Sequence, residues 1–182
     1  MKTKGLYIMF NKLSLATILL ISSVYAKDSF SSERFIGVEA GYGTIRATSA
    51  IEESTEQQGV EFGLRFGAQN EEWRTTISGH FFDKKNQHYF KTMLQFDRFV
   101  WSSLYATDDI IFKPYLGAHV GWVNYVNELD GVSDGFVYGA QAGITWNVLR
   151  EVDFDFGYRY SLSDVSRVNN IGGFVFGVNY LY

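Results

Sequence analysis

Apolar and polar residues alternate along the chain from Phe35 to its end, most clearly over residues 152–162. There, apolar or aromatic side chains occupy one parity, and the other parity holds Asp153, Asp155, Gly157, Arg159 and Ser161. A helix would scatter these residues around its circumference, whereas a strand separates them into an apolar and a polar face. The same period of two recurs near residues 36–43, 60–68, 73–82, 90–97, 112–122, 136–146 and 173–182. The pattern therefore predicts eight β-strands.

The connections between the predicted strands fall into two alternating sets. One set is polar and variable in length, at residues 43–58, 83–88, 127–135 and 163–171, and the other is short, at residues 70–72, 149–151 and near 105–109. An even-stranded barrel with both termini on one side has this asymmetry, with outer loops on one rim and tight turns on the other.

The alternation is least regular between Asp97 and Ile111. Arg98 takes an apolar position there, while Phe99 and Trp101 take polar ones, so we expect either a bulge or a strand end. Pro114 lacks a backbone N–H and is expected at the start of its strand.

The distribution of aromatic residues on the apolar face favours a barrel in a membrane over a soluble β-sandwich, which would also alternate. If both termini lie at the bottom of the barrel, aromatic residues gather near both rims, and mostly Val, Leu, Ile and Ala lie between them. Two aromatic belts around an aliphatic band are typical of the two interfaces of a lipid bilayer. A soluble core would place its largest rings in the middle.

The opposite face of the predicted strands carries glycines and charged residues, which suits the interior of a narrow barrel. Such an interior needs small residues and charges that neutralise one another. We predict an interior charge network of Glu39, Glu61, Arg65, Arg74, His80, Lys91, His119, Asp153, Asp155 and Arg159. Eight strands favour an interior filled by side chains, while the many glycines favour a narrow channel.

Composition excludes several other classes of protein. The chain is 46% hydrophobic and 20% charged, which excludes a disordered protein. It has no cysteine, which excludes a disulfide scaffold, a thiolate metal site, a cysteine nucleophile and a lipid anchor on cysteine. The formal net charge of −4 leaves no global basic surface for nucleic acid.

The first 26 residues have the pattern of a secretory signal peptide. Lysines near the start precede a mostly apolar core at Leu13–Val24, and Ala26 provides a cleavage site. The core is shorter than the roughly 20 residues of a spanning helix. We therefore predict a signal peptide at residues 1–26, starting at Met1 or Met9, and a β-barrel domain at residues 27–182.

The end of the chain resembles the C-terminal assembly signal of bacterial outer-membrane barrels. Gly177, Tyr180 and Tyr182 match its glycine and its two aromatic residues, while Val175 stands at a position that is usually polar. The segment from Lys113 to Trp122 also resembles a stretch common in small outer-membrane proteins of the OmpA/OmpX type, which usually carry glycine where His119 stands. The resemblance covers essentially all of residues 35–182.

The resemblance implies an all-β, eight-stranded antiparallel transmembrane up-and-down β-barrel in the outer membrane of a Gram-negative bacterium. It implies export through the periplasm, with the signal peptide removed. Expected partners are periplasmic chaperones and the barrel-assembly machinery during biogenesis, then outer-membrane lipid and lipopolysaccharide, and an unknown surface ligand at the outer loops. We expect no cofactor, no nucleic acid partner and no peptidoglycan-binding domain after Tyr182.

Two kinds of chemistry remain as alternatives. His80 and His119 share the interior parity and form a candidate metal site with Glu39 or Glu61, but no His-Glu-x-x-His spacing supports it. Some eight-stranded barrels hydrolyse or acylate lipid A with a serine, a histidine and an acid; the deacylase-type His-x-Ser pair is absent, and His88 is predicted on a strand remote from the rim serines. We therefore predict a non-enzymatic, structural or surface-exposed role, with a narrow porin-like channel and a lipid A-modifying enzyme as alternatives.

Overall fold

The computed structural model describes residues 32–47, 55–84, 87–101, 105–106, 111–127, 131–165 and 168–182. These residues form one antiparallel sheet of β1 (Glu33–Ala47), β2 (Thr55–Gln69), β3 (Trp73–Lys84), β4 (Gln87–Phe99), β5 (Tyr105–Ala106), β6 (Ile111–Asn127), β7 (Gly131–Leu149), β8 (Val152–Ser163) and β9 (Val168–Leu181). Within this part of the chain, no helix is long and apolar enough to cross a membrane. The predicted signal peptide and its cleavage after Ala26 lie outside the described residues.

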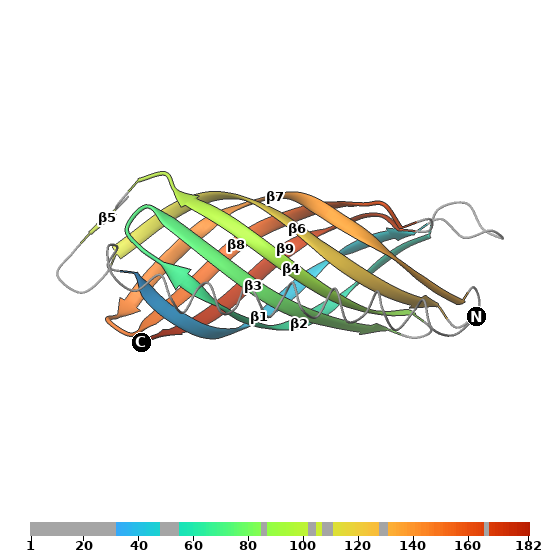
Figure 1. Cartoon of the computed structure of the whole chain (residues 1–182), viewed down its shortest axis with the longest axis horizontal. Helices are drawn as coiled ribbons and strands as arrows, with labels where there is room; N and C mark the ends of the chain where they lie inside the picture. Colours follow the sequence, from blue (N-terminus) through green and yellow to red (C-terminus); the bar gives the residue numbers. More distant parts are fainter. Residues whose placement is uncertain are drawn as a thin grey trace, which may run out of the picture. The chain divides into compact units, whose positions relative to one another are not determined.

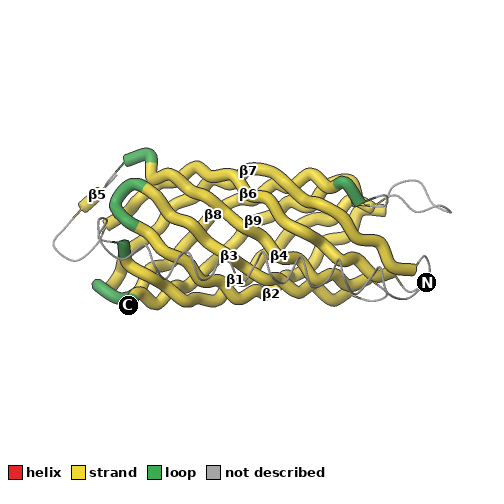
Figure 2. The backbone as a smooth tube through the Cα atoms, viewed as in Figure 1, coloured by secondary structure: helices red, strands yellow, loops and turns green. Residues whose placement is uncertain are grey.

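The sheet closes on itself. β1 pairs with both β2 and β9, and β4 pairs with β6, so the eight long strands form a continuous ring (Figure 1). Each long strand lies beside the long strand that precedes it, and the loops among the described residues lie at the ends of the barrel (Figure 2). The predicted eight-stranded antiparallel up-and-down barrel is therefore confirmed.

Within the described residues after Asp97, a strand end and not a bulge accompanies the irregular alternation. β4 ends at Phe99, and no register shift interrupts its pairing with β6. Arg98 points outward, with its guanidinium carbon 4.8 Å from the ring centroid of Trp73, and Phe99 is buried in the interior. The inward–outward alternation thus continues to the end of the strand. Arg98 can take an outward position because its long cationic side chain covers an aromatic ring there. Pro114 lies near the start of β6, as expected, and its carbonyl accepts a bond from the Val100 amide.

The strands are longer than the sequence pattern predicted. β2, β7 and β9 begin at Thr55, Gly131 and Val168, inside segments interpreted as connections. The two-residue β5, which pairs with the start of β6, was also not predicted. These segments are polar and rich in turn-forming residues, and neighbouring strands supply the hydrogen bonds that hold them extended.

Large apolar side chains cover the outside of the barrel. Phe62, Leu64 and Phe174 are 64%, 67% and 71% exposed, whereas many charged side chains are buried inside. This distribution is the reverse of that in a water-soluble domain, where buried charges are rare.

Aromatic rings on the outside do not form two separate belts everywhere. Near the end with the chain's C-terminus, Phe112 and Trp146 stack with ring centroids 5.5 Å apart. From there a line of rings continues across β8 and β9, through Phe154, Phe176 and Phe156. The predicted aliphatic band is therefore interrupted on this side of the barrel.

The last strand, β9, is hydrogen-bonded to the first strand, β1, up to the end of the chain. The amide of Tyr182 donates to the Arg34 carbonyl at 2.8 Å, and Leu181 pairs with Phe35. In the predicted assembly signal, Gly177 is buried, and Tyr180 and Tyr182 are exposed on the outer face. That this segment directs assembly stays a prediction.

Candidate functional site in the barrel interior

The structure places all ten side chains of the predicted charge network inside the barrel, where each is buried. They come from β1, β2, β3, β4, β6 and β8, at positions whose side chains alternate with the outward apolar ones. A buried charge is tolerated only when it is paired and hydrogen-bonded, so the partners of each group determine what this interior can do.

Near the end with the C-terminus, the network centres on Asp155. Its carboxylate accepts bonds from Arg74 at 2.8 Å and from Arg65 at 2.6 Å. Thr145 donates to it at 2.6 Å and Asn179 at 2.9 Å. Arg74 also pairs with Asp97 at 3.0 Å, an interior acid outside the predicted set. Asp155, Asp97, Arg74 and Arg65 therefore each have a partner of opposite sign.

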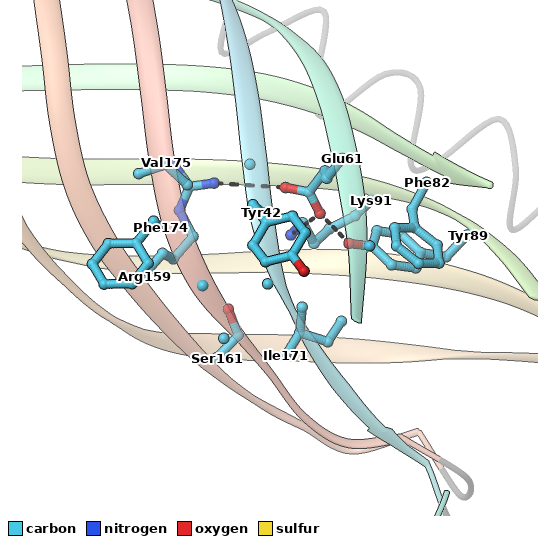
Figure 3. A pocket seen from close by; sticks show the side chains of 15 residues that line it. Tyr42, Glu61, Phe82, Tyr89, Lys91, Arg159, Ser161, Ile171, Phe174 and Val175 are labelled. Carbon is cyan, nitrogen blue, oxygen red and sulfur yellow. Dashed lines mark hydrogen bonds and ion pairs between the residues drawn. The ribbon is translucent and has the colours of Figure 1, made fainter. Parts of the chain in front are cut away.

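The end of the barrel opposite the C-terminus, where β1 ends and β2 begins, is called the loop end below. Further toward this end, the network centres on Glu39 and Glu61. Glu39 accepts bonds from Arg159 at 2.7 Å and Arg65 at 3.1 Å. Glu61 pairs with Lys91 at 2.8 Å and accepts a bond from the Tyr89 hydroxyl (Figure 3). Arg65 therefore joins the two parts of the network, since it also binds Asp155.

Two members of the predicted set bind neutral side chains. His119 bonds to the Ser161 hydroxyl at 2.8 Å. Asp153 accepts bonds from the side-chain amides of Gln69 and Asn147, at 2.7 and 2.6 Å. The sequence analysis predicted interior charges that neutralise one another, but these two side chains are satisfied by hydrogen bonds to neutral groups.

Amide side chains link the charged groups; the sequence pattern placed them on the interior face, but the predicted network did not include them. Gln141 donates to Asp97 at 2.6 Å and to Gln95 at 3.0 Å, and its carbonyl accepts from Arg159 Nε at 3.0 Å. The available signal was the interior parity of both glutamines, because an amide both donates and accepts.

The interior glycines make room for large side chains. A Cβ on Gly157 or Gly143 would lie 2.5 or 2.6 Å from the hydroxyl of Tyr115. A Cβ on Gly177 would lie 2.5 Å from an Arg65 nitrogen. The space that glycine leaves is thus occupied by side chains from other strands.

An apolar cluster occupies the interior at the loop end. Its buried side chains are Phe82, Tyr89, Val123, Tyr125, Val137, Val165, Val168 and Ile171. The rings of Phe82 and Tyr89 stack at 5.0 Å. We call this set the apolar cap; most of it comes from the strand ends that the sequence pattern did not predict.

A small pocket lies between the apolar cap and the charge network. Glu61, Lys91, Arg159 and Ser161 line it together with Phe82 and Tyr89, and it holds about 30 Å³ (Figure 3). A water molecule needs roughly 10–15 Å³ by this measure. The pocket therefore has room for water and none for an organic ligand.

The candidate metal site is only partly assembled. Glu39, Glu61 and His80 offer ligand atoms within 4.8 Å of one another, while His119 is not part of the group. Both carboxylates already pair with cationic side chains, three in all, in the contacts given above. A divalent cation would have to bind against these fixed positive charges, so the arrangement fits charge balance better than metal binding.

The lipid A enzyme alternative needs a serine, a histidine and an acid that a lipid can reach, and the described residues bring such groups into contact only in the buried interior. His88 pairs in register with Asp83 and Val126, not with a serine. Two histidine–serine contacts occur in these ranges, His80–Ser78 and His119–Ser161, each at 2.8 Å and each buried in the interior. His80 Nδ1 lies 3.1 Å from a carboxylate oxygen of Glu61, but that carboxylate already pairs with Lys91, and His119 Nδ1 has no hydrogen-bond partner. A catalytic histidine needs a group on that nitrogen to orient it.

Neither a family model nor a curated protein matches this sequence. Solved structures are similar. Neisserial surface protein A is 20% identical, with 83% of this chain and 99% of that chain covered and a TM-score of 0.60. OprG from Pseudomonas aeruginosa is 14% identical (82% and 96% covered, TM-score 0.53), and the N-terminal barrel domain of OprF from the same organism is 14% identical (79% and 97%, TM-score 0.52). The chain thus has the fold of eight-stranded outer-membrane β-barrel proteins of the OmpA/OmpX type.

Proposed function

We propose that the protein is an integral outer-membrane barrel, non-enzymatic and closed to ions, with a structural or surface-exposed role. Export with removal of residues 1–26, chaperone and assembly-machinery partners, and a surface ligand at the outer loops belong to the same proposal. The fold shared with outer-membrane proteins supports the location.

The outer face supports membrane insertion. Soluble monomers rarely expose contiguous apolar patches larger than a few hundred Å². Here exposed apolar and aromatic side chains recur on all eight long strands. A closed barrel leaves no unpaired sheet edge, as a bilayer requires.

The chain of ion pairs across the interior is the observation that carries the closed state. It runs from Asp97 through Arg74, Asp155, Arg65 and Glu39 to Arg159. Breaking one buried pair costs about 3–5 kcal/mol. An ion passing through would have to break several pairs and then cross the apolar cap, so the geometry favours closure over the narrow channel.

Single-channel recording of the refolded residues 27–182 in a planar bilayer tests closure. We expect no unitary steps from protein that migrates as a folded, heat-modifiable band. Stable unitary steps from the same material would make the protein a small pore.

A second measurement tests the non-enzymatic part. Mass spectrometry of lipid A from a deletion strain and its parent should show the same acylation pattern. A change that a plasmid copy reverses would restore the enzyme alternative, and the same comparison with Ser78→Ala and with Ser161→Ala would identify the serine responsible.

A further inference from the structure

We propose that a quaternary ammonium ion binds an aromatic pocket on the outer wall of the barrel, over β1, β2 and β3 at the loop end. The cation lies against the rings of Tyr42, Phe62 and Phe81, with the carboxylate of Asp83 beside it. This proposal gives a chemical class to the surface ligand of the proposed function, and it rests on that function for a loop end that faces the cell exterior.

The pocket lies where three neighbouring strands bring aromatic rings and an acid together. It holds about 440 Å³ and is lined by Tyr42, Gln58, Gly59, Val60, Phe62, Phe81 and Asp83. β2 lies between β1 and β3 in the sheet (Figure 1). Pockets that bind small organic molecules hold roughly 300–1,000 Å³. The pocket therefore has room for a small organic cation, which the pocket inside the barrel does not.

The strand register explains the hollow. Tyr42 pairs with Val60, and Phe62 pairs with Phe81. Asp83 follows Phe81 by two residues on β3, so it shares the outer face and lies about 7 Å nearer the loop end. The short side chain of Val60 thus lies between the strands that carry Tyr42 and Asp83, and larger side chains surround it.

The three rings suit a cation. All three are exposed on the outer face. The face of an aromatic ring carries partial negative charge and attracts a cation, and cages of such rings bind quaternary ammonium ligands. A purely apolar ligand would gain nothing from the adjacent carboxylate. Rings and acid together therefore favour an organic cation over a neutral molecule.

The charge of the lining favours a cation without a phosphate next to it. Asp83 is exposed and is the one charged residue that lines the pocket. Its register partner on β4, His88, lies on the side of β3 away from the pocket. Within the described ranges, Asp83 forms no ion pair with a lysine or arginine. A phosphate beside the bound cation would meet this carboxylate with no base to compensate it.

The hydrogen-bonding groups favour a quaternary over a primary ammonium. A primary ammonium brings three N–H donors that need acceptors. Asp83 offers a carboxylate, but the side-chain carbonyl of Gln58 already accepts a bond from the Tyr42 hydroxyl at 3.4 Å. A trimethylammonium group has no N–H, so it leaves no donor without a partner against the three rings.

Four probes test this chemistry by saturation-transfer NMR on the refolded barrel in a non-ionic detergent at low salt. They are choline, its uncharged analogue 3,3-dimethyl-1-butanol, the primary ammonium compound ethanolamine, and phosphocholine. We expect saturable binding of choline, about tenfold tighter than binding of the uncharged analogue, because only choline gains the cation–π and carboxylate contacts. Ethanolamine and phosphocholine should both bind more weakly than choline.

Three variants and two matched controls locate the site. Asp83→Asn should lower the affinity for choline about threefold, as for one solvent-exposed charge pair. Phe62→Leu and Phe81→Leu keep an apolar wall but remove an aromatic face, and each should lower the affinity about threefold. Asp134→Asn and Phe136→Leu, at exposed positions of β7, should leave it unchanged. Heat-modifiable migration confirms that each variant is folded.

Equal affinity for choline and its uncharged analogue would overturn the proposal, as would tighter binding of ethanolamine or of phosphocholine. Equal effects of Asp83→Asn and Asp134→Asn in folded protein would overturn it as well. These results would leave membrane insertion and the closed interior intact. A barrel that stays monomeric in water without detergent would instead refute the proposed function itself.

Discussion

Arg74 on β3 reaches across the barrel interior to Asp155 on β8, with 2.8 Å between Nη1 and Oδ1. Around the wall, β2, β1 and β9 lie between the two strands. Asp155 also binds Arg65, so one carboxylate compensates charge on two arginines from neighbouring strands. Its loss should therefore affect stability more than any single pair would suggest.

Replacing Asp155 by Ala should destabilise the folded barrel by more than the about 3–5 kcal/mol that breaking one buried pair costs, because two buried arginines lose a shared partner. Urea unfolding in detergent, followed by tryptophan fluorescence, measures this. Asp134→Ala is the matched control, since Asp134 is exposed on β7, and should change stability by less than about 0.5 kcal/mol. Equal effects of the two substitutions would show that Asp155 does not stabilise the barrel by compensating the charge of the two buried arginines.

Gly157→Ala should destabilise the barrel by about 1–3 kcal/mol, because the new methyl group meets the Tyr115 hydroxyl. Tyr115→Phe removes that oxygen and should recover part of the loss when combined with Gly157→Ala. A double-mutant cycle from urea unfolding measures the coupling. Strict additivity would mean that Tyr115 does not occupy the space beside Gly157.

The interior is closed twice, by the charge network and by the apolar cap, so opening one closure should not produce a channel. Phe82→Ala with Tyr89→Ala should leave single-channel recordings without unitary steps. Adding Glu39→Ala and Arg159→Ala should produce conductance in barrels that still fold. Steps from the cap double variant alone would show that the network does not block ions.

Metal removal should have no effect on the protein. The carboxylates of Glu39 and Glu61 are already paired with cationic side chains, so dialysis against EDTA should leave the thermal unfolding midpoint unchanged. Elemental analysis of protein purified without chelator provides the independent readout. Stoichiometric zinc or nickel that raises the midpoint would show that the trio with His80 is a metal site.

Much of this architecture follows from local sequence. The alternation around Phe154, Asp155 and Phe156 predicts a strand with one polar and one apolar face, because a strand's side-chain period is a property of its own backbone. The same rule indicated which residues face the interior, Arg74 and Asp155 among them. The starts of β2, β7 and β9 were missed, since their polar composition resembles that of loops and only neighbouring strands hold them extended.

Sequence alone could not decide which interior side chains meet. Three contacts depend on the closed ring. Arg74 reaches Asp155, and His119 binds Ser161 rather than an acid. Tyr115 fills the space beside Gly143 and Gly157. The tilt and stagger of the strands set the height of each residue inside a barrel, and these are fixed only when β4 pairs with β6 and β1 with β9. The sequence determined two faces and their chemistry; closure of the sheet decided which charges became partners and that large side chains occupy the space beside the interior glycines.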